Sequence, residues 1–289
     1  MAITYQISEE GIEQINKFFT DEYAYKQWLY KLKTWEVVLE KTEEFVKFSG
    51  DSELKNEDII SYKTAIEAEI VNNFYHMAEA LFNLIISCQT NIPWLTMKNI
   101  KFKDLCDYVR DVIITGELKD EYIRFLFIHG ITEEERKKKK VVESIAFIKE
   151  FLRRLGKIFL DNELYNEYKH GLRLMPSLSE FALTPEDGET PLLYRKGNAH
   201  TYLKTILIQK KKKEELYKIQ RETKSFDYTL YIRLSVIIYR LIHNLFDNRR
   251  QSTKLEKGDL ISVGLFNEEK IDEIFKGDPN KFSLTIPYS

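Results

Sequence analysis

Two stretches of the sequence bring together side chains that could hold a phosphodiester or move its protons. The first is LYNEYKHGLRLMP at residues 164–176, which contains Tyr165, Asn166, Lys169, His170 and Arg173. On a helix, spacings of three and four place all of these except Tyr165 on one stripe. A histidine titrates near neutral pH, so His170 could act as a base, while Lys169 and Arg173 could contact phosphate.

The same stretch also has the features of a helix end. Gly171 stands where a helix commonly takes a left-handed residue, and Pro176 prevents the helix from continuing. Cations in the last turn suit the negative end of the helix dipole. The alternative hypothesis is therefore a structural polar network, with Tyr165 and Asn166 among its members.

A second polar stripe lies about seventy residues further along the chain. It consists of Arg240, His243, Asn244, Asp247 and Asn248, which recur at spacings of three and four and are followed by Arg249 and Arg250. The opposite side of this segment is apolar, so the stripe is either an exposed face or faces the first stripe across a cleft. In the second interpretation, His243 is a further candidate base, and Arg240 and Arg249 are phosphate contacts. Asn244 would belong to the structural polar network.

Apolar residues recurring at intervals of three and four predict that most of the chain is helical. We expect helices at about 8–19, 21–48, 57–88, 103–115, 117–128, 133–170 and 228–250, and a short helix at 267–275. Turn signals and alternating residues predict a small antiparallel β meander at 192–224, although 214–224 could instead begin the following helix. The prediction is a mainly α, multi-helix bundle in one domain over 1–289, with its core at 57–250 and a small antiparallel β insertion.

A run of charges at 132–140 has a structural explanation. Thr132 and Glu135 form a capping box that should begin the helix at Glu133. Three pairs at i,i+4 are in the stabilising orientation, namely Glu133–Lys137, Glu134–Lys138 and Glu135–Lys139. We therefore expect a solvated helix face here in preference to a nucleic-acid contact.

The composition limits the classes of protein that remain. Forty-four basic residues nearly cancel 46 acidic ones, so any nucleic-acid binding would need a local cluster of cations. No phosphate-binding glycine loop, nucleophile elbow or zinc-ligand spacing is present, so we predict no cofactor and no metal. Two cysteines without C-x-x-C spacing indicate a reducing compartment. With neither a signal peptide nor a membrane span recognisable, we expect a cytoplasmic protein with no membrane partner.

Two motifs carry a family resemblance. NFYHMAEALFNLI at 73–85 and YNEYKHGLR at 165–173 resemble a group of bacterial all-α proteins that share these motifs. That group is similar in layout to the HEPN superfamily. The resemblance implies a helical bundle over 57–250, homodimerisation, and metal-independent ribonuclease activity in defence or toxin systems.

The signature of that superfamily is an Arg, then four to six residues, then a His. Formal matches occur at Arg124–His129 and Arg195–His200. Chance alone supplies about one such match. The apolar residues after Arg124 are typical of a buried segment, and the second match has the composition of a hairpin turn.

Two hypotheses about function follow. The leading one is a HEPN-like protein that binds or cleaves RNA, with His170 or His243 as the base. The alternative is a non-enzymatic regulatory or protein-interaction module whose polar stripes hold helices together. The near-neutral net charge slightly favours the alternative.

Overall fold

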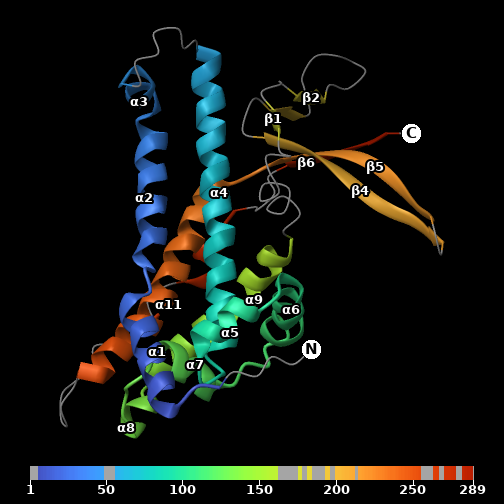
Figure 1. The fold of residues 1–289 in the computed structure, drawn as a ribbon. Helices are drawn as coiled ribbons and strands as arrows, with labels where there is room; N and C mark the ends of the chain where they lie inside the picture. The colour runs from blue at the N-terminus through green and yellow to red at the C-terminus, as the bar shows by residue number, and fades with distance from the viewer. Residues whose placement is uncertain are drawn as a thin grey trace. The chain divides into compact units, whose positions relative to one another are not determined.

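The computed structural model describes residues 6–48, 56–161, 175–177, 181–183, 193–195, 199–211, 214–254, 263–266, 270–277 and 282–288. The prediction of a mainly α protein with a small antiparallel β insertion is confirmed (Figure 1). The described part of the chain contains no helix both long and apolar enough to span a membrane.

The chain divides into two compact units. Unit 1 contains Met1–Tyr30, Tyr75–Asp161 and Arg233–Phe275, and unit 2 contains Lys31–Phe74, Asn162–Ile232 and Lys276–Ser289. Three helices contribute residues to both units: α2 (Lys26–Glu40), α4 (Asn56–Ser87) and α11 (Tyr228–Lys254).

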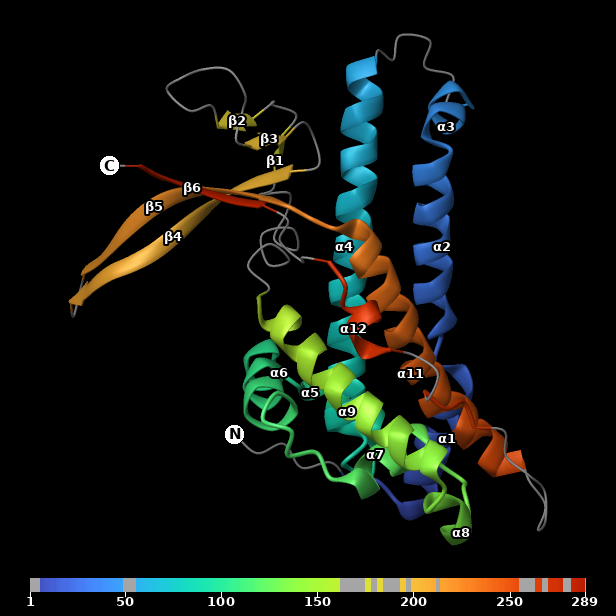
Figure 2. The ribbon, with the colours of Figure 1, turned by 180° about the vertical axis from the view of Figure 1, so that it is seen from behind.

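Unit 1 is helical in its described part. Besides its share of α4 and α11, it contains α1 (Glu9–Glu22), α5 (Pro93–Asn99), α6 (Phe102–Tyr108), a π-helical turn at Val109–Ile113, α7 (Asp120–Phe127), α8 (Glu133–Arg136), α9 (Lys139–Leu160) and α12 (Ile271–Ile274). Figure 2 shows α9 crossing the C-terminal part of α4, where the rings of Phe82 and Phe159 are 5.2 Å apart. Leu81 and Phe82 are fully buried, so the predicted central place of this half of α4 is confirmed.

Unit 2 combines helices with a sheet. Its helical part is α3 (Thr42–Phe48), the rest of α2 and α4, and the first turn of α11. Its strands are β1 (Met175–Ser177), β2 (Phe181–Leu183), β3 (Leu193–Arg195), β4 (Ala199–Lys211), β5 (Glu214–Ser225) and β6 (Phe282–Tyr288). One sheet has the order β1-β4-β5-β6, and β2 pairs with β3 in a second sheet.

The predicted meander at 192–224 is partly right. β4 and β5 form a long antiparallel hairpin, so the alternative that 214–224 begins a helix is wrong. β3, however, pairs with β2 and not with β4, so Arg195–His200 is not a hairpin turn but a connection between two sheets. Two strands outside the predicted range complete the larger sheet, because β1 and β6 supply the hydrogen-bonding partners that β4 and β5 lack.

Three of the predicted helices are broken. The segment predicted as a helix at 21–48 begins as α2 only at Lys26, and Lys41 separates α2 from α3. The Thr42 hydroxyl bonds back to the carbonyls of Val38 and Leu39, a contact that competes with regular helix geometry. The segment at 103–115 changes from α to π geometry at Val109.

The predicted helix at 133–170 is also discontinuous. Its capping box is confirmed, with the Thr132 hydroxyl accepting from the Glu135 amide, but α8 ends at Arg136 and α9 ends at Leu160. Continuing the helix through 137–138 would place the like charges of Arg136 and Lys140 at i,i+4, which is unfavourable. The ion pairs are consequently not the predicted ones: Arg136 pairs with Glu133, Lys138 with Glu135 and Lys139 with Glu143. The lysines at 137–140 are exposed, as predicted for a solvated face.

Candidate functional site

The first predicted site lies outside the described residues. This applies to Tyr165, Asn166, Lys169, His170 and Arg173. Whether this stripe converges with the stripe on α11 therefore stays a prediction.

The second stripe lies on α11, in unit 1. Its histidine, His243, is half-buried, and its Nδ1 is 3.0 Å from the Tyr25 hydroxyl. The imidazole also stacks on Tyr239, with the ring planes 11° apart. Arg240 lies over the ring of Phe266, 4.5 Å from its centroid. The two candidates are thus each in contact with aromatic side chains of unit 1.

Three further members of the stripe bond to backbone carbonyls. Asn244 donates to the carbonyl of Gly264 at 2.7 Å, and Asn248 donates to that of Phe127 at 3.1 Å. Arg250 donates to the carbonyls of Thr20 and Asp21 at 2.6 and 2.8 Å. Since a buried carbonyl without a partner costs free energy, these contacts fasten three chain segments to α11.

The Gly264 contact also explains why a glycine stands there. A Cβ built on that residue would lie 2.9 Å from the Asn244 side-chain oxygen, closer than real contacts allow. Asn244 therefore has the environment expected for a member of a structural polar network.

Arg249 has a different environment from the rest of the stripe. Its guanidinium lies over the ring of Phe125, 5.0 Å from the centroid, and donates to the carbonyl of Leu245 within its own helix. Burial lowers the pKa of Arg249 from its usual value. The side chain also lines a pocket of about 210 Å³.

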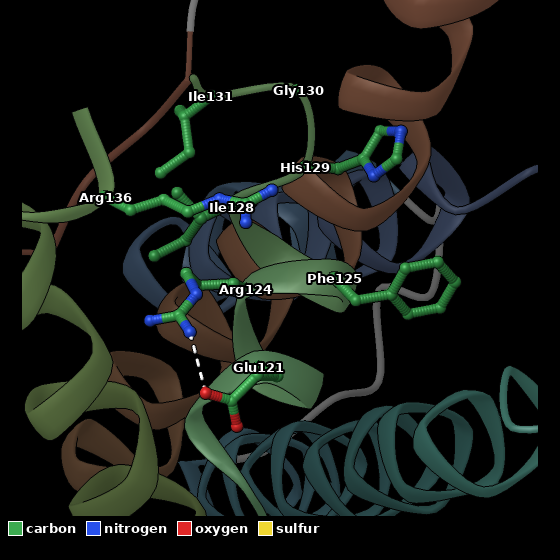
Figure 3. A pocket seen from close by; sticks show the side chains of 8 residues that line it. All are labelled: Glu121, Arg124, Phe125, Ile128, His129, Gly130, Ile131 and Arg136. Carbon is green, nitrogen blue, oxygen red and sulfur yellow. Dashed lines mark hydrogen bonds and ion pairs between the residues drawn. The ribbon is translucent and has the colours of Figure 1, made fainter. Parts of the chain in front are cut away.

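A neighbouring pocket brings together residues that we had not combined into a site from the sequence. It has a volume of about 290 Å³ and is lined by Glu121, Arg124, Phe125, Ile128, His129, Gly130, Ile131 and Arg136 (Figure 3). We call it the Phe125 pocket. It contains one of the two formal Arg–His matches.

Local structure explains how the Phe125 pocket forms. The face of α7 that carries Ile123, Leu126 and Phe127 is buried, which turns Arg124 and Phe125 outward. The helix ends at Phe127, and Gly130 adopts a φ of 91°, a conformation that favours glycine. This turn directs the chain into α8, which supplies Arg136.

The interpretation of Arg124–His129 as a buried segment is right only in part. Leu126, Phe127 and Ile128 are buried, but Phe125 is 45% exposed. Phe125 lies on the outward face of α7, whereas the three residues after it are buried. The signal that could have found the pocket was the Arg–His spacing itself.

The charges around the Phe125 pocket are partly compensated. Arg124 forms an ion pair with Glu121 at 3.0 Å, shown by the dashed line in Figure 3, and Arg136 pairs with Glu133. In Figure 3 the Arg136 side chain extends across the pocket above Arg124, and the His129 and Phe125 rings lie on the other side. The His129 and Phe125 rings meet edge to face, with centroids 6.0 Å apart.

The protonation of His129 follows from its surroundings. Burial, and secondarily the charge of Arg249, lower the pKa of His129 from its usual value. The imidazole is therefore neutral at physiological pH and can accept a proton.

The second formal match does not form a comparable site. His200 lies in β4 and is 4% exposed, and burial lowers its pKa to about 4. Arg195 ends β3 in the other sheet. Within the described ranges, no three potential metal-binding side chains gather in one place.

Comparisons with other proteins assign no function to these residues. The chain matches no protein-family model, no curated protein and no solved structure.

Proposed function

We propose that this chain is a HEPN-like helical protein that binds RNA at the Phe125 pocket. The observation that carries the proposal is the set of side chains lining that pocket: two guanidiniums, an imidazole and an exposed aromatic ring. Guanidiniums are suited to phosphate oxygens, and an exposed ring is suited to stacking on an unpaired base. Such a local cluster of cations is what a protein of nearly neutral net charge needs for binding RNA.

Cleavage is a further step of the same proposal. A neutral His129 would take the proton of the ribose 2′-hydroxyl, whose oxygen would attack phosphorus while the 5′-oxygen leaves and takes up a proton. Arg124 or Arg136 would stabilise the negative charge that develops on the phosphate oxygens. His170, with His243 second, remains the alternative base, and Lys169, Arg173 and Arg240 remain the alternative phosphate contacts.

RNA binding can be tested by fluorescence anisotropy with a mixed single-stranded RNA pool at low salt. Arg124→Gln combined with Arg136→Gln should weaken binding at least about tenfold, because two phosphate contacts are lost. Arg110→Gln is the matched control, since Arg110 is likewise an arginine paired with an acid three residues earlier, Asp107. Equal binding by wild-type protein and the double variant would overturn the proposed site.

Cleavage is tested separately on the same RNA pool, in the presence of a metal chelator. His129→Gln should abolish cleavage while RNA binding and the melting temperature stay close to those of the wild-type protein. Cleavage that persists in His129→Gln and disappears in His170→Gln would move the catalytic role to the first stripe.

The alternative function, a protein-interaction module, is favoured by one specific observation in unit 2. The β4–β5 hairpin exposes Leu203, Ile206, Leu207, Ile208, Leu216, Tyr217 and Ile219. Beyond Thr201, β4 pairs only with β5 among the described residues, and the stretch at 205–209 contains neither a charge nor a proline. Apart from the β-bulge between Leu207 and Gln209, this strand edge lacks the charges and prolines that commonly prevent pairing with another chain.

A second copy of the chain is the partner that we propose for this edge. Antiparallel pairing of two β4 strands centred on Ile206 would place Lys204 opposite Ile208 and Lys210 opposite Tyr202, so no two lysines would face each other. Such a contact is self-complementary, as a twofold dimer requires. Leu203→Lys with Ile208→Lys should convert a dimer into a monomer in sedimentation, whereas Val37→Lys, an equally exposed aliphatic of unit 2, should not.

We also place the protein in the cytoplasm. Cys88 is buried and both described cysteines are free thiols, which suits a reducing compartment.

A further inference from the structure

Arg249, which directly follows the α11 stripe, carries a positive charge that no described carboxylate neutralises by an ion pair. It occupies unit 1 together with Cys88, Tyr122 and Phe125, and its guanidinium has five N–H donors. Among the described residues, the guanidinium of Arg249 donates a hydrogen bond to the Leu245 carbonyl at 2.9 Å, and no carboxylate forms an ion pair with Arg249. The titratable neighbours that act on it are the Cys88 thiol and the Tyr122 hydroxyl, and burial raises the pKa of each, so both are neutral at physiological pH.

Arg249 is half-buried, and partial burial of a guanidinium without an anion costs free energy. Removing a cation from water is compensated only when an opposite charge or several hydrogen bonds replace the solvent. The ring of Phe125 and one helical carbonyl replace only a small part of the hydration of the guanidinium. Arg154 has a comparable ring contact in unit 1, over Phe275, but it also pairs with the carboxylates of Glu150 and Asp272.

The space beside Arg249 is open and partly polar. The pocket of about 210 Å³ is formed by α1, by the turn after α4, by α7 and by α11, and its polar lining includes Asn16, Thr20, Thr90 and Asn91. Asn16 donates to the Asn91 carbonyl at 2.7 Å, while its own side-chain oxygen is buried and has no hydrogen-bond partner. The pocket is smaller than the roughly 300–1,000 Å³ of sites for drug-sized ligands, so it suits a small anion.

We propose that this pocket binds a small anion carrying a phosphate or carboxylate group, held by the guanidinium fork of Arg249. Two oxygens of such a group match the parallel N–H donors of an arginine. A phosphate with a protonated oxygen, or a water bound to the anion, would also donate to the unpaired oxygen of Asn16. This site shares the Phe125 ring with the Phe125 pocket, but its anion contact is Arg249, so it does not depend on the Arg124 and Arg136 contacts proposed for RNA.

The geometry predicts which chemical feature of Arg249 matters. Lysine would keep the positive charge but lose the paired donors, and methionine would keep the length of the side chain but lose both. Binding should therefore decrease from arginine to lysine to methionine. A purely structural arginine, held by Phe125 alone, would show no such order.

The test measures thermal unfolding as sodium phosphate or sodium acetate replaces sodium chloride at constant ionic strength. Phosphate stabilises folded proteins generally, so the informative quantity is the difference between wild-type protein and Arg249→Met. The wild-type protein should show a saturable rise in melting temperature with at least one of the two anions. Arg249→Met should raise the apparent dissociation constant at least about tenfold, with Arg249→Lys in between.

Arg154→Met is the matched control, because it removes another ring-stacked arginine of unit 1 that does not line the pocket. It should keep the full response to the anion. A response to phosphate but not acetate identifies a phosphate group as the ligand, and the reverse identifies a carboxylate; either outcome supports the site. The same response in wild-type protein and Arg249→Met overturns it.

A second measurement avoids any dependence on the folding of the variants. The Nε–H signal of Arg249 in the NMR spectrum of the wild-type protein should shift saturably with the same anion and at the same concentrations. A signal that does not move while the anion is titrated to about 50 mM, well above the low-millimolar affinity of a weak specific site, overturns the proposal. Loss of RNA binding in the Arg124 and Arg136 variants leaves this shift unchanged, so the two proposals fail separately.

Discussion

The C-terminal half of α4 and the β4–β5 hairpin both contain large aliphatic and aromatic side chains, but α4 buries them and the hairpin exposes them. In unit 1, Leu81 and Phe82 of α4 are fully buried. In unit 2, Leu203 and Ile208 of β4 are 58% and 60% exposed. Burial of apolar surface is the main stabilising term of a fold, so α4 contributes to folding, whereas much of the apolar surface of the hairpin remains available for association.

The difference lies in what surrounds each element. The C-terminal half of α4 buries a broad apolar face, which is covered within unit 1 by other helices, including α9. Among the described strands, the hairpin is a two-stranded ribbon beyond Thr205 of β4 and before Ile219 of β5, because β6 pairs with Ile219–Ser225 and β1 with Ala199–Thr201. A two-stranded ribbon cannot cover both of its own faces.

Removing a large buried side chain should have the greatest effect on stability. Phe82→Ala should lower the free energy of unfolding by about 3–5 kcal/mol, because it removes apolar contacts and leaves a cavity. Leu203→Ala on the hairpin is the control and should cost less than about 1 kcal/mol. Denaturant titration of both variants compares the two regions directly, and equal losses would contradict the contrast between them.

The base of the hairpin should be less accessible to water than its exposed part, and the pKa of His200 measures this difference. His200 stays neutral in the folded protein down to its pKa of about 4, whereas in the unfolded chain it takes up a proton near pH 6.5. Between these two pH values the unfolded state therefore binds more protons than the folded state. The contribution of neutral His200 to stability is complete above about pH 6.5 and is lost as the pH falls toward 4. The loss should reach about 3 kcal/mol, from the pKa difference.

An NMR titration of the His200 ring checks this directly. A midpoint near 4 agrees with a buried base of the sheet. A midpoint near 6.5 would mean that the base is as open to water as the rest of the hairpin. His200→Phe should remove this part of the pH dependence, since Phe226 already offers an aromatic contact at that position.

Removing a buried side-chain hydrogen bond from unit 1 should lower its stability by less than removing a large apolar side chain. Asn248 is almost fully buried and donates to the Phe127 carbonyl, so Asn248→Ala should cost about 1–3 kcal/mol by leaving that carbonyl without this donor. Gln14→Ala removes an exposed side-chain hydrogen bond to Glu10 and should have little effect. Thermal unfolding of the two variants provides the comparison; similar melting temperatures would show that Asn248 is not an anchor.

The smallest effect is expected on the exposed surface of unit 1. Replacing the four lysines at 137–140 by glutamine should shift the melting temperature by less than about 2 °C, because exposed ion pairs contribute little. RNA binding should also persist. A large loss of RNA binding in this variant would show that the lysines form the binding surface and that a solvated face is the wrong interpretation.

Local sequence determined the helices, their caps and the buried half of α4. The Thr132 cap forms as predicted, and Ser8 caps α1 in the same way, because a capping hydroxyl and the amide that it accepts from are three residues apart. The buried stripes of α4 and α11 follow from helical periodicity, which is again a property of neighbouring residues. The β4–β5 hairpin was found for the same reason, since its strands are adjacent in the chain.

Tertiary structure alone decided the contacts that lie far apart in sequence. Asn248 and Phe127 are 121 residues apart, and no local pattern could have linked an α11 side chain to the end of α7. The partner of β3 and the lining of the Phe125 pocket were decided in the same way. The sequence placed Arg249 directly after a polar stripe, but only the packing around it determined that its guanidinium faces a pocket without a carboxylate to pair with.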